Sequence, residues 1–167
     1  ITHTEKGKSI YIEIDGAMAY SMLWLNGKLV GGWPYGYNSF QLDLTPYINF
    51  GGDNQLAIRL DNPPNSSRWY PGGGIYRNVW LLKVSPLHVA QWGTFIRARN
   101  VTAASATIDL DVHIENNSAK EQSAELVTRI FALDAAFKKM GRPTATFSKS
   151  LLNIKAGEKK KIANTVS

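Results

Sequence analysis

One stretch decides how this sequence folds: residues 67–82 read Ser-Arg-Trp-Tyr-Pro-Gly-Gly-Gly-Ile-Tyr-Arg-Asn-Val-Trp-Leu-Leu. Its first half predicts a rigid turn, because Pro71 fixes its own φ and Gly72 can adopt the positive φ that a type II turn needs. Its second half predicts a strand in which Arg77 shares one face with apolar side chains. The members of that face are Ile75, Arg77, Val79 and Leu81. We therefore expect Arg77 to be a buried charge with a partner.

The turn carries three side chains that suit a binding site, Arg68, Trp69 and Tyr70. Two interpretations are open. In the first, the stretch is only a glycine-rich β-turn that leads into a core strand. In the second, the three side chains are displayed on a loop tip because a planar, polyhydroxylated ligand stacks there. Aromatic rings pack on the apolar face of a sugar, and the Arg68 guanidinium group donates several hydrogen bonds.

Fifteen consecutive positions of this stretch resemble a family signature. Ser-Arg-Trp-Tyr-Pro-Gly-x-Gly-Ile-Tyr-Arg-Asn-Val-Trp-Leu is similar to the end of the N-terminal sugar-binding domain in family 2 glycoside hydrolases, the β-galactosidase and β-glucuronidase family. Three further motifs match in order and spacing: Leu-Asn-Gly-Lys-Leu-Val-Gly at 25–31, Gly-Tyr-x-x-Phe at 36–40 and Asp-Leu-Thr at 43–45. The resemblance covers nearly all of residues 7–90.

Composition predicts two domains within the 167 residues. All seven Tyr, four of the five Trp and eleven of the fourteen Gly precede His88, whereas twelve of the nineteen basic residues follow it. The shift coincides with Ser85-Pro86, which we interpret as a linker. We expect a jelly-roll, galactose-binding-like β-sandwich over 1–86, with its N-terminal part missing. We expect an immunoglobulin-like β-sandwich over 87–167, with its C-terminal end missing.

Alternation of apolar and polar residues predicts the strands of an all-β fold. In the first domain the predicted strands are 9–14, 19–25, 28–31, 40–44 and 55–60. Asn26-Gly27 predicts a tight hairpin, and Thr45 is expected to cap a helical turn that begins at Pro46. In the second domain the predicted strands are 108–115, 124–132, 146–154 and 160–166, a spacing typical of an immunoglobulin-like sandwich. Family 2 enzymes carry such a domain directly after the sugar-binding one, so the resemblance implies the same order.

The carboxylates of this chain do not suggest a catalytic pair. A retaining glycosidase needs two carboxyl groups roughly 5 to 5.5 Å apart, one as acid and base and the other as nucleophile. Asp109, Asp111 and Glu115 share one face of a predicted strand, which is typical of a solvated surface. The resemblance implies that both catalytic carboxylates lie on a third domain, a (β/α)8 barrel that this chain lacks. We therefore expect no catalytic residue here and no activity of the chain alone.

Further aromatic residues lie between glycines and prolines, at Trp33, Tyr35 and Tyr37. For these side chains, packing against the rim of the jelly roll and stacking on a sugar are open alternatives. The resemblance implies that the loop around Arg68 reaches toward the barrel and helps to close the pocket around the terminal sugar. Some family members have an acidic residue in place of Arg68, so a galactosidase, a glucuronidase and a mannosidase all remain open.

Other chemistry finds little support in the sequence. The net charge is +6, but the dense basic run at 159–161 lacks interleaved aromatic residues and predicts an exposed strand start rather than a nucleic-acid site. The chain has no cysteine, and His3, His88 and His113 lack metal-ligand spacing, so we expect no metal and no cofactor. No apolar run is long enough to span a membrane. The compartment and assembly into a homo-oligomer stay open.

Two hypotheses follow. The first is a non-catalytic N-terminal piece of a retaining family 2 β-glycosidase, most like a β-galactosidase, whose partners are the carbohydrate substrate and the barrel. The second is a stand-alone carbohydrate-binding or adhesion module without any barrel. Several hundred residues of alternating strands and helices downstream of Ser167 would distinguish the first from the second.

Overall fold

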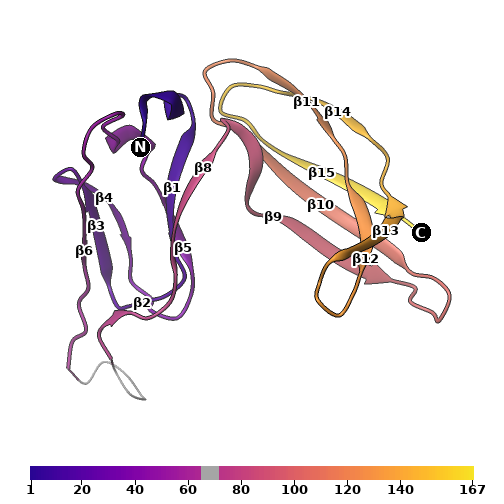
Figure 1. Ribbon diagram of the computed structural model, residues 1–167, viewed down its shortest axis with the longest axis horizontal. Helices are drawn as coiled ribbons and strands as arrows, with labels where there is room; N and C mark the ends of the chain where they lie inside the picture. Colours follow the sequence, from indigo (N-terminus) through magenta and orange to yellow (C-terminus); the bar gives the residue numbers. More distant parts are fainter. Residues whose placement is uncertain (65–71) are drawn as a thin grey trace. The chain divides into compact units, whose positions relative to one another are not determined.

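The computed structural model describes residues 1–64 and 72–167, which form two compact units, Ile1–Ser85 and Pro86–Ser167 (Figure 1). Antiparallel strands build both units, so the all-β prediction of two successive sandwiches is confirmed. The described helices are two single 3-10 turns, η1 (His3–Glu5) and η2 (Thr45–Tyr47). None of the helices in the described part of the chain is long and apolar enough to cross a membrane.

The first unit contains two three-stranded sheets whose apolar faces share one core. One sheet has the order β5-β1-β8, and its strands are β1 (Ser9–Ile14), β5 (Phe40–Asp43) and β8 (Val79–Val84). The other has the order β4-β3-β6, and its strands are β3 (Ser21–Leu25), β4 (Lys28–Trp33) and β6 (Leu56–Arg59). A short pair, β2 (Ala17–Met18) and β7 (Gly74–Ile75), lies at one end of this unit (Figure 1).

The core of the first unit follows from the alternation in its strands. Ile10, Ile12 and Ile14 of β1 are at most 3 % exposed, and Leu23 and Leu25 of β3 meet them from the other sheet. Burial of each such side chain stabilises the unit by roughly 1.5 to 3 kcal/mol.

Two local predictions have different outcomes. The hairpin is confirmed: Asn26 and Gly27 have φ values of 53° and 76°, the two positive values that a type I′ turn requires, and Leu25 pairs with Lys28. The helical turn also forms, but its N-cap residue is Leu44 rather than Thr45. The Thr45 hydroxyl instead accepts a hydrogen bond from the backbone N–H of Ile10 at 2.9 Å, which ties the turn to β1.

The predicted burial of Arg77 is wrong. Arg77 is exposed, and its guanidinium carbon lies 5.5 Å from the centre of the Tyr76 ring. Arg77 lies between β7 and β8 rather than within a strand, so the expected alternation is interrupted there. The apolar side chains of the same predicted face, Ile75, Val79 and Leu81, are themselves 42 to 51 % exposed. Val79 and Leu81 line an open groove of about 450 Å³ that also contacts Leu56 of β6.

The second unit has a three-stranded sheet of order β15-β10-β9 and, facing it, two two-stranded sheets, β11-β14 and β12-β13. The strands are β9 (Leu87–Arg99), β10 (Thr107–Asn116), β11 (Gln122–Leu126), β12 (Arg129–Leu133), β13 (Lys139–Thr146), β14 (Ser150–Ile154) and β15 (Lys159–Val166). Their inward residues form a second core of Leu110, Val112, Ile114, Phe147, Leu152 and Ile154.

The sequence patterns missed part of this unit. The predicted strand 124–132 is divided into β11 and β12, and β9 and β13 were not expected. In β9 a bulge hides the pattern, because Trp92 has a φ of 48° and the register with β10 shifts beside it. A Cβ at Gly93 would lie 2.6 Å from the Ala90 carbonyl oxygen, so the bulge requires glycine there.

Candidate functional site

The predicted binding residues Arg68, Trp69 and Tyr70 lie outside the described residues. The residues on both sides of this stretch are described, and residues 17–19 pair with both sides. Before the loop, the backbone N–H of Asp61 donates to the Ala19 carbonyl oxygen at 2.9 Å. After the loop, Gly74 pairs with Met18 in the β2–β7 ladder. Residues 17–19 therefore hold Asp61 and Gly74, which are described residues on the two sides of residues 65–71.

Five exposed aromatic side chains belong to the same end of the unit, and we call them the aromatic rim. They are Tyr20, Trp33, Tyr35, Tyr37 and Tyr76, each between 39 % and 59 % exposed. Two hydrogen bonds to backbone carbonyls connect segments of the rim. The Tyr20 N–H donates to the Pro34 carbonyl at 3.1 Å, and the Tyr76 hydroxyl donates to the Gly36 carbonyl at 2.7 Å. Residues 20 and 76 are thus connected to the loop at 34–39.

Side-chain contacts orient the rim further. The indole N–H of Trp33 donates to Asn38 Oδ1 at 2.8 Å, and its ring stacks on Phe40 with centres 6.2 Å apart. Tyr35 and Tyr37 meet edge to face, with ring centres 5.6 Å apart. Tyr35 and Tyr37 are thus paired with each other, and Asn38 fixes the Trp33 ring. These contacts reduce the conformational entropy that the side chains would lose when a ligand binds.

Two glycines let the rim pack closely. A Cβ at Gly36 would lie 2.6 Å from the sulfur of Met18, and a Cβ at Gly16 would lie 2.7 Å from the ring of Tyr76. Any larger residue at either position would push the loop or the Tyr76 ring outward. The sequence did not single out Tyr20 or Tyr76 as rim residues. Gly16, which leaves room for the Tyr76 ring, is a signal that could have identified Tyr76.

One carboxylate lies next to this end of the unit. Asp15 accepts a hydrogen bond from the Trp80 indole at 2.9 Å and another from the Ser39 hydroxyl at 3.3 Å. Both oxygens of Asp15 are therefore engaged in positioning neighbours. Of the sequence-predicted aromatic residues, Trp33, Tyr35 and Tyr37 come together here, with Trp33 as the last residue of β4 rather than in a loop.

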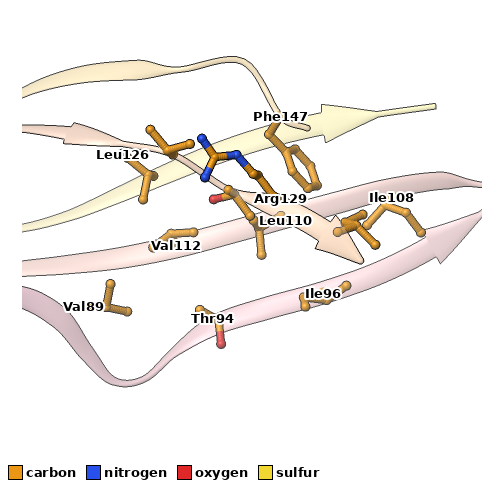
Figure 2. A pocket seen from close by; sticks show the side chains of 12 residues that line it. Val89, Thr94, Ile96, Ile108, Leu110, Val112, Leu126, Arg129 and Phe147 are labelled. Atoms are coloured by element: carbon orange, nitrogen blue, oxygen red, sulfur yellow. The ribbon is translucent and has the colours of Figure 1, made fainter. Parts of the chain in front are cut away.

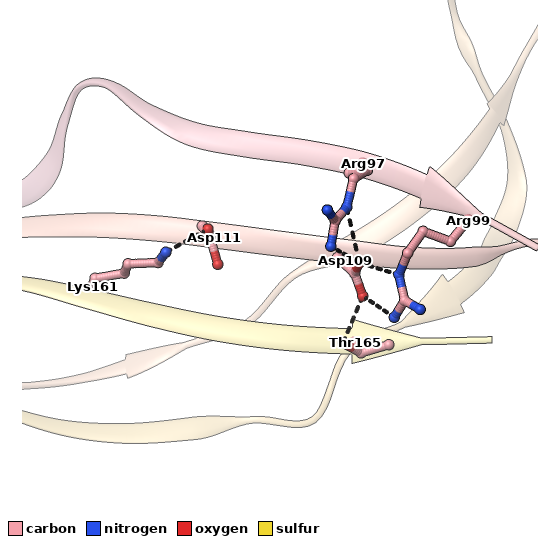
Figure 3. A network of polar contacts seen from close by, with 6 residues as sticks. All are labelled: Arg97, Arg99, Asp109, Asp111, Lys161 and Thr165. Atoms are coloured by element: carbon pink, nitrogen blue, oxygen red, sulfur yellow. Dashed lines mark hydrogen bonds and ion pairs between the residues drawn. The ribbon is translucent and has the colours of Figure 1, made fainter.

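The carboxylates of β10 form ion pairs on the outer face of the second unit (Figure 3). Asp109 accepts hydrogen bonds from Arg99, from Arg97 and from the Thr165 hydroxyl, the last at 3.0 Å. The hydrogen bond from Arg99, and then that from Arg97, holds the pKa of Asp109 well below its usual range. A carboxylate kept ionised in this way is a poor proton donor, so Asp109 is suited to a surface ion pair rather than to acid catalysis.

Among residues 1–64 and 72–167, no three His, Asp or Glu side chains are grouped as metal ligands. The described site offers the exposed rings and hydroxyl groups of the aromatic rim, with the Asp15 carboxylate next to them.

No protein-family model matches the sequence. Among curated proteins, the chain is similar to a β-galactosidase of Bacteroides ovatus, with 41 % identity over 132 residues that cover 78 % of this chain and 15 % of the relative. It is also similar to a β-glucuronidase of Formosa agariphila, with 29 % identity over an alignment of 184 positions that covers 98 % of this chain and 18 % of the relative.

Solved structures of glycoside hydrolases share the fold of this chain. A glycosyl hydrolase family 2 member from Bacteroides cellulosilyticus superposes with a TM-score of 0.87 and 33 % identity, over 99 % of this chain and 20 % of that one. A β-glucuronidase of Bacteroides uniformis superposes with a TM-score of 0.86 and 29 % identity, over 100 % of this chain and 20 % of that one. The chain thus spans about one fifth or less of the length of these relatives.

Proposed function

Because this chain belongs to glycoside hydrolase family 2, we propose that it is a non-catalytic part of a retaining β-glycosidase that removes terminal β-linked sugars from glycans. The observation that carries this proposal is the aromatic rim, which lies next to residues 17–19, the segment that holds Asp61 and Gly74 on the two sides of the sequence with Arg68, Trp69 and Tyr70. Exposed rings that are held by hydrogen bonds are suited to the C–H faces of sugars, which gain most from a surface that is already ordered.

The proposal includes a role for the loop residues. Trp69 and Tyr70 would stack on the terminal sugar, and Arg68 would donate hydrogen bonds to its hydroxyl groups or to a carboxylate. A (β/α)8 barrel of the same protein would supply the acid and the nucleophile. The low share of each relative that this chain covers supports this division of labour.

The proposal also assigns domains. Residues 1–86 would form the jelly-roll sugar-binding domain, without its N-terminal part, and residues 87–167 the immunoglobulin-like domain, without its C-terminal end. The division of the described chain into compact units at Ser85 and Pro86 supports this assignment.

Among the sugars, we propose a β-galactoside. The support is the 41 % identity to a β-galactosidase, against 29 % to a β-glucuronidase over a longer alignment. The test compares the full-length protein with residues 1–167 on aryl β-galactosides and aryl β-glucuronides. We expect the full-length protein to hydrolyse the galactoside faster and residues 1–167 to hydrolyse neither. Preference for the glucuronide would overturn the choice of sugar, and inactivity on both would overturn the function.

A second candidate is a carbohydrate-binding module that acts without a barrel. It is favoured by one observation, that Tyr20 and Tyr76 of the rim are hydrogen-bonded to the loop at 34–39 within the first unit itself. Titration calorimetry of residues 1–167 with galactose and lactose distinguishes the two. A stand-alone module should bind in the millimolar range or better, whereas half of a composite pocket should give no measurable heat.

A further inference from the structure

The outer face of the second unit has a hollow of about 340 Å³ on the sheet formed by β9, β10 and β15. Thr94 and Ile96 of β9 line an apolar groove on the inner side of this sheet (Figure 2), whereas Phe95 and Arg97 line the hollow on the outer face. Arg99 lines it too, and the Phe95 ring is 62 % exposed. Guanidinium groups beside an exposed ring suit a ligand that has both an anionic group and an apolar face.

One carboxylate holds both arginines in place (Figure 3). Asp109 accepts two hydrogen bonds from each of them, with Nη2 of Arg97 3.0 Å from Oδ2 and Nη2 of Arg99 2.8 Å from Oδ1. The Thr165 hydroxyl donates to the same carboxylate at 3.0 Å. A carboxylate offers about four lone-pair sites, so these partners occupy Asp109 fully. The two guanidinium groups are thus ordered before any ligand binds, which lowers the entropy cost of binding.

Both guanidinium groups keep donors and charge for a ligand. A guanidinium group has five N–H donors, and Asp109 accepts two from each arginine. The side chains of Arg97 and Arg99 are 61 % and 45 % exposed, so water or a ligand can reach them. The neighbouring Asp111 is paired with Lys161 at 2.7 Å. Three cationic side chains therefore accompany two carboxylates, which leaves an excess positive charge at the hollow.

The spacing of the side chains fits a sugar ring. Phe95 pairs with Asp111 of β10, and Ala163 of β15 lies on the other side of Asp111. Since Ala163 has only a methyl group, this row of the sheet is low. The next outward row contains Arg97 and Asp109 and lies two residues along β9, roughly 7 Å away. A pyranose ring that stacks on Phe95 would therefore have a substituent within reach of the guanidinium groups.

We propose that this hollow binds a hexuronate unit of an acidic glycan, with the carboxylate on Arg97 and Arg99 and the C–H face of the ring on Phe95. A carboxylate matches the planar fork of a guanidinium group, and Asp109 shows that these arginines bind a carboxylate here. The inference goes beyond the proposed function, because it adds a ligand to the second unit and requires no hydrolysis.

The lining of the hollow favours a glycan over a protein segment. Among the described residues that line it, Phe95 and Ala163 are the apolar ones. A protein interface has an apolar core that two such residues do not supply, whereas one exposed ring is enough to stack on a sugar.

NMR titration of residues 1–167 with α-1,4-linked tetragalacturonate at low salt tests the ligand. We expect a Kd of about 1 mM or below and shift changes at the amides of 95–99 and 163–165. The methyl ester of the same tetrasaccharide keeps the sugar rings without the charge, and it should bind at least about tenfold more weakly. Equal binding of the ester, or of a tetraglutamate peptide, would overturn the proposal. Absence of binding to both tetragalacturonate and a hyaluronan hexasaccharide would overturn it too.

Three variants and a matched control test the residues. Arg97→Gln and Arg99→Gln should each raise the Kd for tetragalacturonate about tenfold, because each removes charged hydrogen-bond donors. Phe95→Ala should raise it about threefold or more through lost stacking. Arg142→Gln removes the same charge from an exposed residue of β13, in the other layer, and should change the Kd less than about twofold. If Arg142→Gln weakens binding as much as Arg97→Gln, the ligand responds only to net charge and the proposal fails.

A conservative variant separates a lost contact from a disturbed fold. Exposed ion pairs contribute little to stability, so all of these variants should melt within about 2 °C of the parent. Arg97→Lys keeps the charge, but an ammonium group lacks the planar fork, so it should still weaken binding about threefold or more. Full affinity in Arg97→Lys would overturn the role assigned to the guanidinium group.

The full-length protein separates this inference from the proposed function. If it hydrolyses aryl β-galactosides but does not bind tetragalacturonate, only the hexuronate proposal fails. If it binds tetragalacturonate through Arg97 but hydrolyses no glycoside, only the proposed function fails.

Discussion

At the scale of single residues, Asn116 shows how a polar side chain can hold a core together. It is fully buried, and its amide nitrogen donates to the carbonyls of Lys120, Ile154 and Lys155 at 2.8, 2.9 and 3.1 Å. Its oxygen accepts from the hydroxyl of Ser118 at 2.7 Å. These bonds join the end of β10 to the turn before β11 and to the end of β14, so Asn116 links both layers of the second unit.

We predict that Asn116→Ala lowers the free energy of unfolding of the second unit by about 2 to 3 kcal/mol, because buried carbonyl groups would lose their donor. Urea denaturation measures the change. Lys120→Ala, whose side chain is exposed on the same turn, is the control and should cost less than about 0.5 kcal/mol. Equal costs for the two variants would show that the amide is not what holds the turn.

Glu5 predicts how the first unit responds to acid. Its carboxylate accepts a charged hydrogen bond from Lys83 Nζ at 2.7 Å, which, with the Thr2 backbone N–H, lowers the pKa of Glu5 from 4.5 to about 2. A carboxylate with a lowered pKa in the folded state stabilises it fully above pH 4.5, and this contribution is lost as the pH falls toward 2.

Thermal melts between pH 6 and pH 2 should therefore show a smaller loss of stability for Glu5→Gln than for the parent protein, with the difference appearing below about pH 4.5. Asp109 acts in the same direction in the second unit, because its pKa is also lowered. If the melting temperatures of Glu5→Gln and the parent fall in parallel over this range, the ion pair with Lys83 does not contribute.

At the scale of residues, the sequence predicted those features that depend only on neighbouring residues in the chain. The Asn26-Gly27 turn and the buried face of β1 could be predicted because backbone preference and alternation act over a few residues. The burial of Arg77 could not, since the strand expected across residue 77 is interrupted between β7 and β8, and alternation of residue types does not report such a break.

At the scale of elements, the bulge of β9 is the clearest test of packing. A Cβ at Gly93 would lie 2.6 Å from the Ala90 carbonyl oxygen and 2.9 Å from that of His113, and backbone atoms cannot move aside as a side chain can. Gly93→Ala should therefore destabilise the second unit by about 1 to 3 kcal/mol.

Gly52→Ala provides the control, because the nearest atom to its new Cβ would be 3.8 Å away and its φ is not positive. It should change the unfolding free energy by less than about 0.5 kcal/mol. Denaturant titrations of both variants decide the matter. A Gly93→Ala protein as stable as the parent would mean that the bulge can relax into a regular ladder.

Elements were predicted best where they alternate without interruption. β10 was found almost to the residue, whereas β9 was missed because its bulge at Trp92 breaks the period of two. The rim was predicted in part, since Trp33, Tyr35 and Tyr37 lie close together in the sequence. Tyr20 and Tyr76 join them only through contacts between segments far apart in the chain.

At the scale of the whole molecule, each unit has its own core, so each should unfold as its own transition. Leu23→Ala should lower the stability of residues 1–85 alone, and Ile154→Ala that of residues 86–167 alone, each by about 2 to 5 kcal/mol. Native-state hydrogen exchange reports the two units separately. A loss of protection that spreads into the unmutated unit would mean that the two cores are coupled.

The central claim is that the loop with Arg68, Trp69 and Tyr70 completes a sugar pocket in a longer enzyme. The most direct measurement is kcat/KM of the full-length Trp69→Ala protein on an aryl β-galactoside, together with the melting temperature of the same variant of residues 1–167. The account predicts a fall in kcat/KM of at least about tenfold, from poorer substrate positioning, and a melting temperature within about 2 °C of the parent. Unchanged kcat/KM, or a variant of residues 1–167 that melts well below the parent, would contradict it.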